Sequence, residues 1–419
     1  MFLPNSSRTT LLLGFALLLT GCGSPGRLGK PLAPAANIRS AHFANATGSV
    51  LGATFTPGNR IETLNNGAEI FPAMLAGIRS ARSTVNLETF VFYHGEVPQQ
   101  FAEALAERAR AGVRVKVILD AVGSKKSRRY HSMLRDAGVD LVVYRPLFSM
   151  DFQRYNHRTH RKLLIVDGKL GFIGGVGIAD DWDGHARNPE EWRDLHYRVR
   201  GPVVAQLQAA FNDNWFLAKK ELLQGPEYYP TLAPAGNARA GIFYSSPVRG
   251  RASVDFLYHL TIASARESLL IANAYFLPDK PLVDALCAAA QRGVKVKVII
   301  PGEHMDQKAV ARASRKRWPK LLAAGVQIYQ FEPTMIHTKL LIADGSFVSV
   351  GSSNFDPRSL AINDEANMNV LDVAFAREQT RIFERDLRRS RPVEVDPTNP
   401  GRLKDLPQSM AEKPLESQL

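Results

Sequence analysis

The chain carries His160-Arg161-Lys162-Leu163-Leu164-Ile165-Val166-Asp167-Gly168 and, further on, His337-Thr338-Lys339-Leu340-Leu341-Ile342-Ala343-Asp344-Gly345. In each copy a histidine and a lysine stand two residues apart, ahead of an apolar run and an Asp-Gly pair. Residues two apart in a strand project from the same face. Each copy therefore predicts a strand that presents its histidine and lysine together and then turns tightly into a second strand.

The duplication extends beyond these two segments. Ala111–Asp120 recurs as Arg292–Pro301, and Ala137–Tyr144 recurs as Ala324–Tyr329. A repeat of this length indicates duplicated domains rather than a solenoid of short units. Strand patterns and amphipathic helix stripes occur in both halves, so the predicted fold class is α/β. Cys287 lies on one of the helix stripes, where we expect inert core rather than a nucleophile.

Composition narrows the class of protein. The chain has 419 residues, 45% of them apolar and 22% charged, which suits a globular protein of two domains. Its two cysteines, Cys22 and Cys287, exclude a disulfide scaffold and a cysteine-based zinc cluster. A formal charge of +13 favours an anionic partner, which is nucleic acid, an acidic membrane surface or a phosphate-bearing substrate.

The N-terminus has the pattern of a secretion signal. After Arg8, the apolar run from Leu11 to Leu19 is too short to span a bilayer. Leu19-Thr20-Gly21-Cys22 resembles the lipobox of bacterial lipoproteins, which implies cleavage before Cys22 and lipidation of its thiol. An ordinary secretory signal is the alternative. We expect a lipid-anchored protein of the bacterial cell envelope, with its body in the periplasm and the outer membrane favoured by Gly23.

Breaks in the patterns predict the domain boundaries. The expected segments are a signal peptide over residues 1–21, a tether over 22–60, a first domain over 61–225, a proline-rich linker over 226–243, a second domain over 244–392 and a polar tail over 393–419.

The paired histidines and lysines suit phosphodiester chemistry. A neutral imidazole can attack phosphorus near neutral pH, and a second imidazolium can protonate the leaving alkoxide. Lysines with amide and hydroxyl donors can offset the charge on the nonbridging oxygens without a metal or other cofactor. Each half supplies one such histidine, so the site requires the halves to pack about a pseudo-twofold axis with both strands facing one cleft. His157, near His160, lacks the spacing of further ligands that a metal site would need.

The duplicated HxKxxxxD pattern, with Gly351-Ser352-Ser353-Asn354 after the second copy, resembles the phospholipase D superfamily over roughly residues 65–390. Within that superfamily the chain is similar to bacterial cardiolipin synthases. The supporting stretches are Tyr275–Asp279, Glu332–His337, Ser353–Ser359 and Trp192–His196 before Gly201-Pro202. The resemblance implies two phospholipase D-like α/β/α sandwich domains that share one active site.

The resemblance also implies roles for the site residues. His160 would be the nucleophile that forms a phosphohistidine, and His337 the acid and then the base that activates the acceptor. Glu365 and Asp194 would be the carboxylates behind the two histidines. The residues that would hold the phosphate are Lys162, Lys339, Ser352, Asn354 and Gly175, whereas Asp167 and Asp344 are expected to hold the turns.

One position departs from the cardiolipin synthase pattern. Gly174-Gly175-Val176-Gly177 stands where these enzymes usually carry Gly-Gly-x-Asn. Gly177 has no side chain that donates a hydrogen bond, and the loss of one donor typically costs about 1–3 kcal/mol if nothing compensates. We therefore expect a poorer phosphate site in the first half, with both histidines and both lysines in place.

Two basic clusters follow the repeated strands at corresponding places. They are Lys125, Lys126, Arg128 and Arg129 in the first half, and Arg312, Arg315, Lys316, Arg317 and Lys320 in the second. They are either solvated helix faces or surfaces that draw in anionic headgroups. Trp318, beside the second cluster, either dips into a lipid interface or packs in the core.

Three functions are open on the sequence alone. The first is a cardiolipin-synthase-type phosphatidyltransferase that acts on phospholipids through a phosphohistidine. The second is a phosphodiesterase, in which water replaces the lipid acceptor: a phospholipase D, or an endonuclease, although we expect no nucleic acid as a partner. The third is an inactive lipoprotein that binds anionic lipid at the membrane surface.

Overall fold

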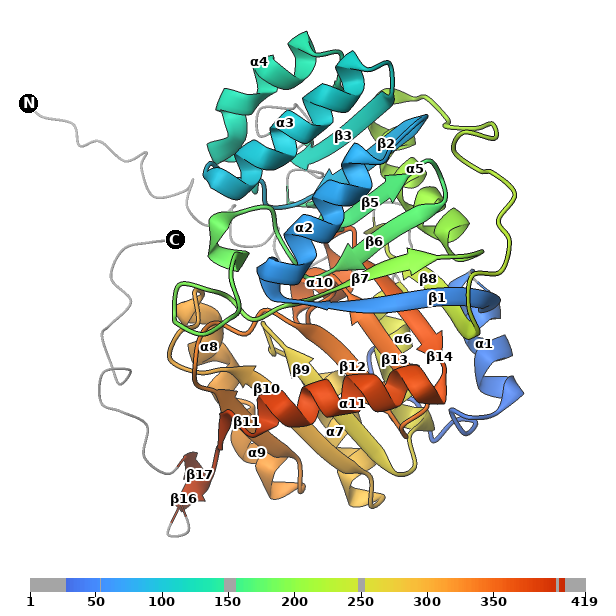
Figure 1. Ribbon diagram of the computed structural model, residues 1–419. Helices are drawn as coiled ribbons and strands as arrows, with labels where there is room; N and C mark the ends of the chain where they lie inside the picture. The colour runs from blue at the N-terminus through green and yellow to red at the C-terminus, as the bar shows by residue number, and fades with distance from the viewer. Residues whose placement is uncertain (1–27, 53, 147–155, 248–252, 397–398, 404–419) are drawn as a thin grey trace, which may run out of the picture.

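The structure is a computed structural model that describes residues 28–52, 54–146, 156–247, 253–396 and 399–403 (Figure 1). The elements of its first part are α1 (Ala41–Leu51), β1 (Thr56–Asn65), α2 (Asn66–Arg79), β2 (Thr84–Thr89), α3 (Glu96–Arg110), β3 (Arg114–Asp120), η1 (Lys125–Ser127), α4 (Arg128–Asp136), β4 (Asp140–Tyr144), β5 (Leu163–Val166), β6 (Leu170–Gly174), η2 (Asp180–Trp182), β7 (Leu195–Arg200) and α5 (Val204–Lys219).

The second part repeats this series and adds short terminal strands. Its elements are β8 (Ala238–Tyr244), α6 (Ser253–Ser264), β9 (Ser268–Asn273), α7 (Lys280–Gln291), β10 (Lys295–Pro301), α8 (Lys308–Arg315), α9 (Trp318–Ala323), β11 (Gln327–Phe331), β12 (Lys339–Ala343), β13 (Phe347–Gly351), α10 (Pro357–Ala361), β14 (Ala366–Leu371), α11 (Val373–Leu387), β15 (Ser390–Pro392), β16 (Val395–Asp396) and β17 (Asn399–Leu403).

The strand order shows the duplication directly. One sheet runs β15-β11-β10-β9-β12-β13-β14-β8-β1-β7-β6-β5-β2-β3-β4. Outward from its centre, β1-β7-β6-β5-β2-β3-β4 matches β8-β14-β13-β12-β9-β10-β11 strand for strand. The two series meet where β1 and β8 pair antiparallel, so this order suits two copies related by a twofold axis. The predicted α/β fold of two duplicated halves is confirmed.

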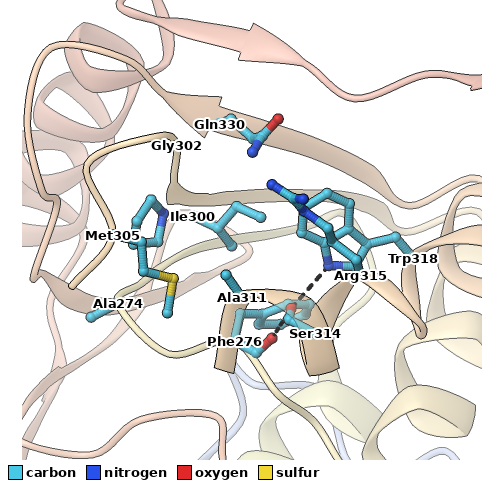
Figure 2. A pocket seen from close by; sticks show the side chains of 11 residues that line it. Ala274, Phe276, Ile300, Gly302, Met305, Ala311, Ser314, Arg315, Trp318 and Gln330 are labelled. Atoms are coloured by element: carbon cyan, nitrogen blue, oxygen red, sulfur yellow. Dashed lines mark hydrogen bonds between the residues drawn. The ribbon is translucent and has the colours of Figure 1, made fainter. Parts of the chain in front are cut away.

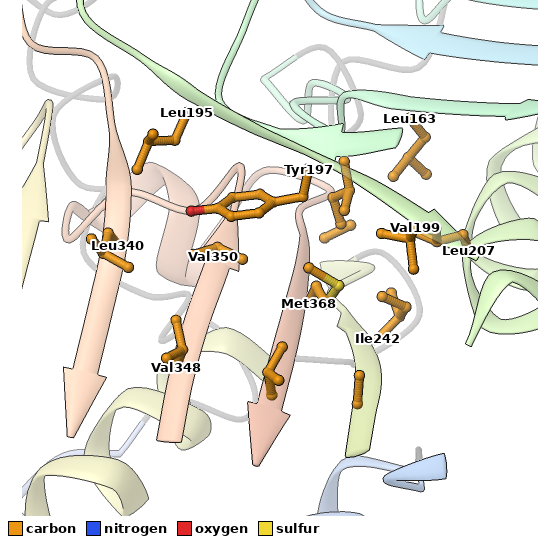
Figure 3. Packing of buried hydrophobic residues seen from close by; sticks show 14 of the residues in the cluster. Leu163, Leu195, Tyr197, Val199, Leu207, Ile242, Leu340, Val348, Val350 and Met368 are labelled. Atoms are coloured by element: carbon orange, nitrogen blue, oxygen red, sulfur yellow. The ribbon is translucent and has the colours of Figure 1, made fainter. Parts of the chain in front are cut away.

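Helices cover the sheet on both faces, as expected for α/β/α sandwiches (Figure 1). In the first half α2, α3 and α4 lie on one side, and in the second half α6, α7 and α9 do so. The opposite faces carry α5 and α11, whose apolar residues join one cluster with strands of both halves. Leu163 and Tyr197 from the first half belong to this cluster together with Leu340, Val350 and Met368 from the second (Figure 3). Because each buried apolar side chain of this size contributes about 1.5–3 kcal/mol, the cluster holds the two halves together.

The two Asp-Gly pairs form the predicted turns. Asp167 and Asp344 have φ angles of 52° and 48°, in the left-handed region. The Asp167 carboxylate accepts backbone N–H bonds at the start of β2, and Asp344 does the same at the start of β9. These contacts support the structural role expected of both aspartates.

Several side chains lie where the helix and strand patterns predict. Trp215 is fully buried in α5, and Cys287 is a free, buried cysteine in α7. Trp318 is only 2% exposed and donates from Nε1 to Ser314 Oγ at 2.9 Å. Its core interpretation is therefore confirmed, and the alternative in which it dips into lipid is wrong because almost none of the side chain reaches the surface.

Some segments differ from the pattern-based expectation. Two strands begin later than predicted: β5 begins at Leu163 and β12 at Lys339, after His160 and His337. The linker interval 226–243 contains most of β8, and the tether interval 22–60 contains α1 and the start of β1. The polar-tail interval includes β16 and β17. The domain boundaries themselves stay predictions.

The secretion signal and Cys22 lie outside the described residues. Within the described ranges, no helix is both long and apolar enough to cross a membrane.

Candidate active site

Buried polar contacts fix the segment that carries His160. The His160 backbone N–H donates to the carbonyl oxygen of Asp364 at 2.8 Å. Its neighbour Thr159 donates from the backbone to Asp120 Oδ2 at 3.1 Å and from its hydroxyl to Glu88 Oε1. Since Glu88, Asp120 and Asp364 are all buried, this segment has little freedom to move.

Glu365 orients the His160 ring from the opposite half of the chain. His160 Nδ1 lies 3.0 Å from both carboxylate oxygens of Glu365. Ser352 and Ser359 donate hydroxyl bonds to the same carboxylate. When Nδ1–H donates to Glu365, the Nε2 lone pair is left for chemistry.

His337 has the mirrored arrangement. Its Nδ1 lies 2.9 Å from Asp194 Oδ2, and its backbone N–H donates to the Arg193 carbonyl at 2.7 Å. Asp194 also accepts from Trp182 Nε1 at 3.0 Å and from the Leu195 backbone at 2.8 Å. Each histidine is thus backed by a carboxylate from the other half, so neither half contains a complete pair.

The two lysines join the pairs into one site. Lys162 Nζ donates to the His160 carbonyl at 2.7 Å, and Lys339 Nζ lies 3.0 Å from His337 Nδ1 and 3.1 Å from Nε2. The charge of Lys339 also lowers the pKa of His160, and that of Lys162 lowers the pKa of His337. These cross-influences agree with the contacts between the halves, which bring the two histidine segments close together as the duplicated motif requires.

Burial sets the protonation of these groups. It lowers the pKa of His160, which Glu365 partly opposes, and it lowers the pKa of His337, with Lys339 adding to the effect. Burial alone would raise the pKa of Glu365 and of Asp194, but their hydrogen bonds and the neighbouring positive charges hold both pKa values below the usual range. The resting site therefore contains neutral imidazoles against ionised carboxylates near neutral pH.

Both lysines titrate near neutral pH. Burial lowers the pKa of Lys162 to about 7 and that of Lys339 to about 8. Only the protonated form can neutralise a phosphate, so we expect kcat/KM to fall as the pH rises from about 7 to about 9. A bound phosphate favours the ammonium forms, so the corresponding fall in kcat should lie at higher pH. Initial rates from pH 5 to 10 measure both profiles, and a kcat/KM that rises steadily to pH 9 would contradict this assignment.

The predicted phosphate-binding residues differ in what they can offer. The Ser352 hydroxyl donates to Glu365, so it supports the carboxylate rather than facing outward. Asn354 is 3% exposed, and its Oδ1 has no hydrogen-bond partner among the described residues. A Cβ atom at Gly175 would lie 2.4 Å from Asp194 Oδ1, so this position needs glycine for the carboxylate to approach. Their roles as phosphate ligands stay a prediction.

Aromatic side chains form a wall that the sequence reasoning did not assign to the site. The rings of Trp182, Trp192 and Tyr275 lie 5.1, 5.6 and 6.0 Å from the His337 ring. Phe90 lies 5.4 Å from the His160 ring. Trp192 and Tyr275 belong to stretches that suggested cardiolipin synthases, which was a usable signal, whereas nothing in the pattern singled out Trp182 or Phe90.

A small pocket, large enough for about one water molecule, lies beside this wall in the second half (Figure 2). Phe276, Ile300, Met305 and Trp318 give it apolar sides, and it also contacts Arg315. Ala274, which precedes Tyr275, lines it as well. The pocket is therefore a mostly apolar space one residue away from the aromatic wall.

The basic clusters are partly engaged within the protein. Lys126 Nζ lies 4.7 Å over the Tyr93 ring, Arg317 donates to the Pro278 carbonyl at 2.7 Å, and Lys320 pairs with Asp284 at 2.6 Å. Arg312 and Lys316 are exposed. An attraction for lipid headgroups stays a prediction for the exposed members.

In the part of the chain that the structure describes, no three His, Cys, Asp or Glu side chains gather as metal ligands would. His157 Nδ1 instead bonds the Ile362 carbonyl at 2.7 Å.

A duplicated α/β fold, in which two His-x-Lys segments meet and each histidine bonds a carboxylate of the other half, defines the class of phospholipase D-like proteins. The family described as "Cardiolipin synthase, PLD-like domain" matches residues 74–215 and 258–387. The chain belongs to this family.

Individual relatives agree with this assignment. The chain is 36% identical to "Cardiolipin synthase 2" of Bacillus anthracis over 345 residues, which is 81% of this chain and 67% of the relative. It is 35% identical to a probable cardiolipin synthase of Bacillus subtilis (strain 168) over 359 residues, 84% of this chain and 69% of that one. The crystal structure of phosphatidylserine synthase from Haemophilus influenzae Rd KW20 has a TM-score of 0.65 at 13% identity, over 88% of this chain and 95% of that chain. That likeness concerns the fold alone.

Proposed function

We propose that the protein is a cardiolipin-synthase-type phosphatidyltransferase that acts on phospholipid phosphodiesters. The observation that carries the proposal is the crossed arrangement of His160 with Glu365 and His337 with Asp194, with a lysine beside each histidine. Family membership and relatives named cardiolipin synthases support the choice of lipid substrates.

The first half-reaction forms a phosphatidyl-histidine. His160 Nε2 attacks the phosphorus of the donor lipid, and the bond from phosphorus to the headgroup oxygen breaks. The leaving alkoxide takes a proton from the His337 imidazolium. In the free site burial lowers the pKa of His337, but a phosphodiester anion bound beside it favours the protonated ring.

The second half-reaction reverses these roles. Neutral His337 takes the proton of an acceptor lipid hydroxyl, whose oxygen attacks the phosphorus, and the bond from phosphorus to His160 Nε2 breaks. Lys162 and Lys339 neutralise charge on the nonbridging oxygens in both steps. Asn354, which is buried just after β13, would supply a further donor.

Anchoring at Cys22 in the bacterial envelope is part of the proposal, supported by the lipobox-like stretch. In cells supplied with labelled palmitate, the parent protein should incorporate label and a Cys22→Ser variant should not.

Lipid extraction and mass spectrometry after incubation with phosphatidylglycerol test the function. We expect cardiolipin and free glycerol in equal amounts. Phosphatidic acid in place of cardiolipin would make water the acceptor and the protein a hydrolase. Binding of the vesicles without any product would leave only the inactive lipid-binding interpretation.

A further inference from the structure

The two histidine–carboxylate pairs are built differently. In the second half, Ser352 and Ser359 donate hydroxyl bonds to Glu365. Gly175 occupies the first-half position that matches Ser352, so no hydroxyl can serve Asp194 there. The donor is instead the indole of Trp182, whose Nε1 lies 3.0 Å from Asp194 Oδ2. A side chain from η2 thus replaces one that the repeat would have placed after β6.

Gly177 provides the room for that indole. A Cβ atom at Gly177 would lie 2.8 Å from Val91 Cβ and 3.0 Å from two ring carbons of Trp182. An asparagine side chain, such as Asn354 at the matching second-half position, would overlap the ring. The glycine that removes a donor from the first half is therefore the one that admits Trp182.

The indole is also packed against the histidine that it would influence. The Trp182 and His337 rings meet nearly at right angles, at 87°. The Trp192 ring also packs against Trp182, with 4.4 Å between the ring centroids. Trp182 is 2% exposed, so water does not compete for its N–H. Asp194 Oδ2 receives both this N–H and His337 Nδ1–H, while Oδ1 receives the Leu195 backbone.

We propose that Trp182 is a positioning residue that holds the Asp194 carboxylate against His337 Nδ1, and that Gly177 is kept small to admit it. By fixing Oδ2, Trp182 fixes the tautomer of His337, with the proton on Nδ1 and the lone pair on Nε2. The effect on turnover rests on the proposed function, whereas the effect on the tautomer does not.

The test replaces the indole N–H and reads the tautomer. Trp182→Phe removes the donor, and 3-benzothienylalanine at position 182 removes it while keeping the shape, which guards against a variant that fails to fold. In protein with ¹⁵N-labelled histidine, with His337 assigned from the His337→Gln variant, we expect mostly Nδ1–H in the parent. Both Trp182 variants should show a clear share of Nε2–H. If transfer occurs, kcat should fall about 10- to 100-fold, as for the loss of one hydrogen bond to a charged group.

A matched control exists elsewhere in the chain. Trp215 is buried and also donates from Nε1 to a carboxylate, Glu221, at 2.9 Å, but it lies in α5, away from the two histidines. Trp215→Phe loses the same kind of bond and should leave the His337 tautomer unchanged. Gly177→Ala should shift the tautomer as Trp182→Phe does, because its Cβ displaces the ring.

An unchanged His337 tautomer in both Trp182 variants would overturn the inference, as would an equal change in Trp215→Phe. If the tautomer shifts in the Trp182 variants but the parent protein forms no lipid product, the proposed function is wrong and the positioning role still holds.

Discussion

We expect His160→Gln to abolish phosphatidyl transfer, with kcat reduced by about 10⁴- to 10⁶-fold, the range found when a catalytic nucleophile is removed. The amide cannot form the phosphorus–nitrogen bond, so no covalent intermediate accumulates. His337→Gln should reduce turnover by a similar factor for a different reason, because the leaving alkoxide loses its proton donor. Incubations with ³²P-labelled phosphatidylglycerol, quenched in SDS at mildly alkaline pH where the phosphorus–nitrogen bond survives, distinguish the two: His160→Gln should trap no label, whereas His337→Gln should trap it slowly.

The control for these variants is His42→Gln, a change in an exposed histidine of α1 that should leave turnover unaltered. If either active-site variant retained turnover within tenfold of the parent, the mechanism with two histidines would be wrong. Label trapped by His160→Gln but not by His337→Gln would exchange the roles of nucleophile and acid.

The second large effect concerns the carboxylates. Glu365→Gln and Asp194→Asn should each lower kcat by about 10²- to 10⁴-fold. An amide cannot accept the Nδ1–H bond with the strength of a carboxylate, and its own N–H₂ would face a donor, which favours the wrong tautomer. Both groups are fully buried, so no water substitutes for the lost acceptor. Steady-state kinetics with phosphatidylglycerol measure the loss.

Asp344→Asn is the matched control for the carboxylate variants. Asp344 lies in the same motif as His337, but its carboxylate accepts backbone N–H bonds from Glu267 and Ser268 at the far end of the strand. This variant should lower the melting temperature and leave kcat near the parent value. A loss of kcat as large as that of Asp194→Asn would mean that general destabilisation, rather than tautomer control, explains the carboxylate effects.

The sequence predicts the histidines and lysines of the site better than the residues that orient them. His160, Lys162, His337 and Lys339 could be predicted together, because the HxK spacing occurs in both copies of the repeat, each time ahead of an apolar run. Glu365 and Asp194 were identified only through resemblance, since contacts between residues so far apart in the chain leave no local pattern. Trp182, which reaches Asp194 from a short 3₁₀ helix, was not identified from the sequence at all.

Local sequence patterns predicted the helices, but they missed a strand that depends on contacts between distant parts of the chain. Amphipathic spacing identified α5 and α7, whose apolar faces are buried as expected. The prolines Pro226, Pro230 and Pro234 led us to predict a linker over residues 226–243, although most of β8 lies in this interval. A short strand at the seam of two halves depends on its pairing with β1 and β14, and this tertiary contact is invisible in composition.

The crossed carboxylates have an evolutionary consequence. If a single ancestral unit once worked as a pair of identical copies, every substitution would have altered both imidazoles at once. Joining the copies in one gene would remove that constraint. The carboxylate behind one histidine could then be held by hydroxyl groups and the carboxylate behind the other by an indole. Donor and acceptor steps of a catalytic cycle can then be tuned by separate mutations, which strict symmetry would forbid.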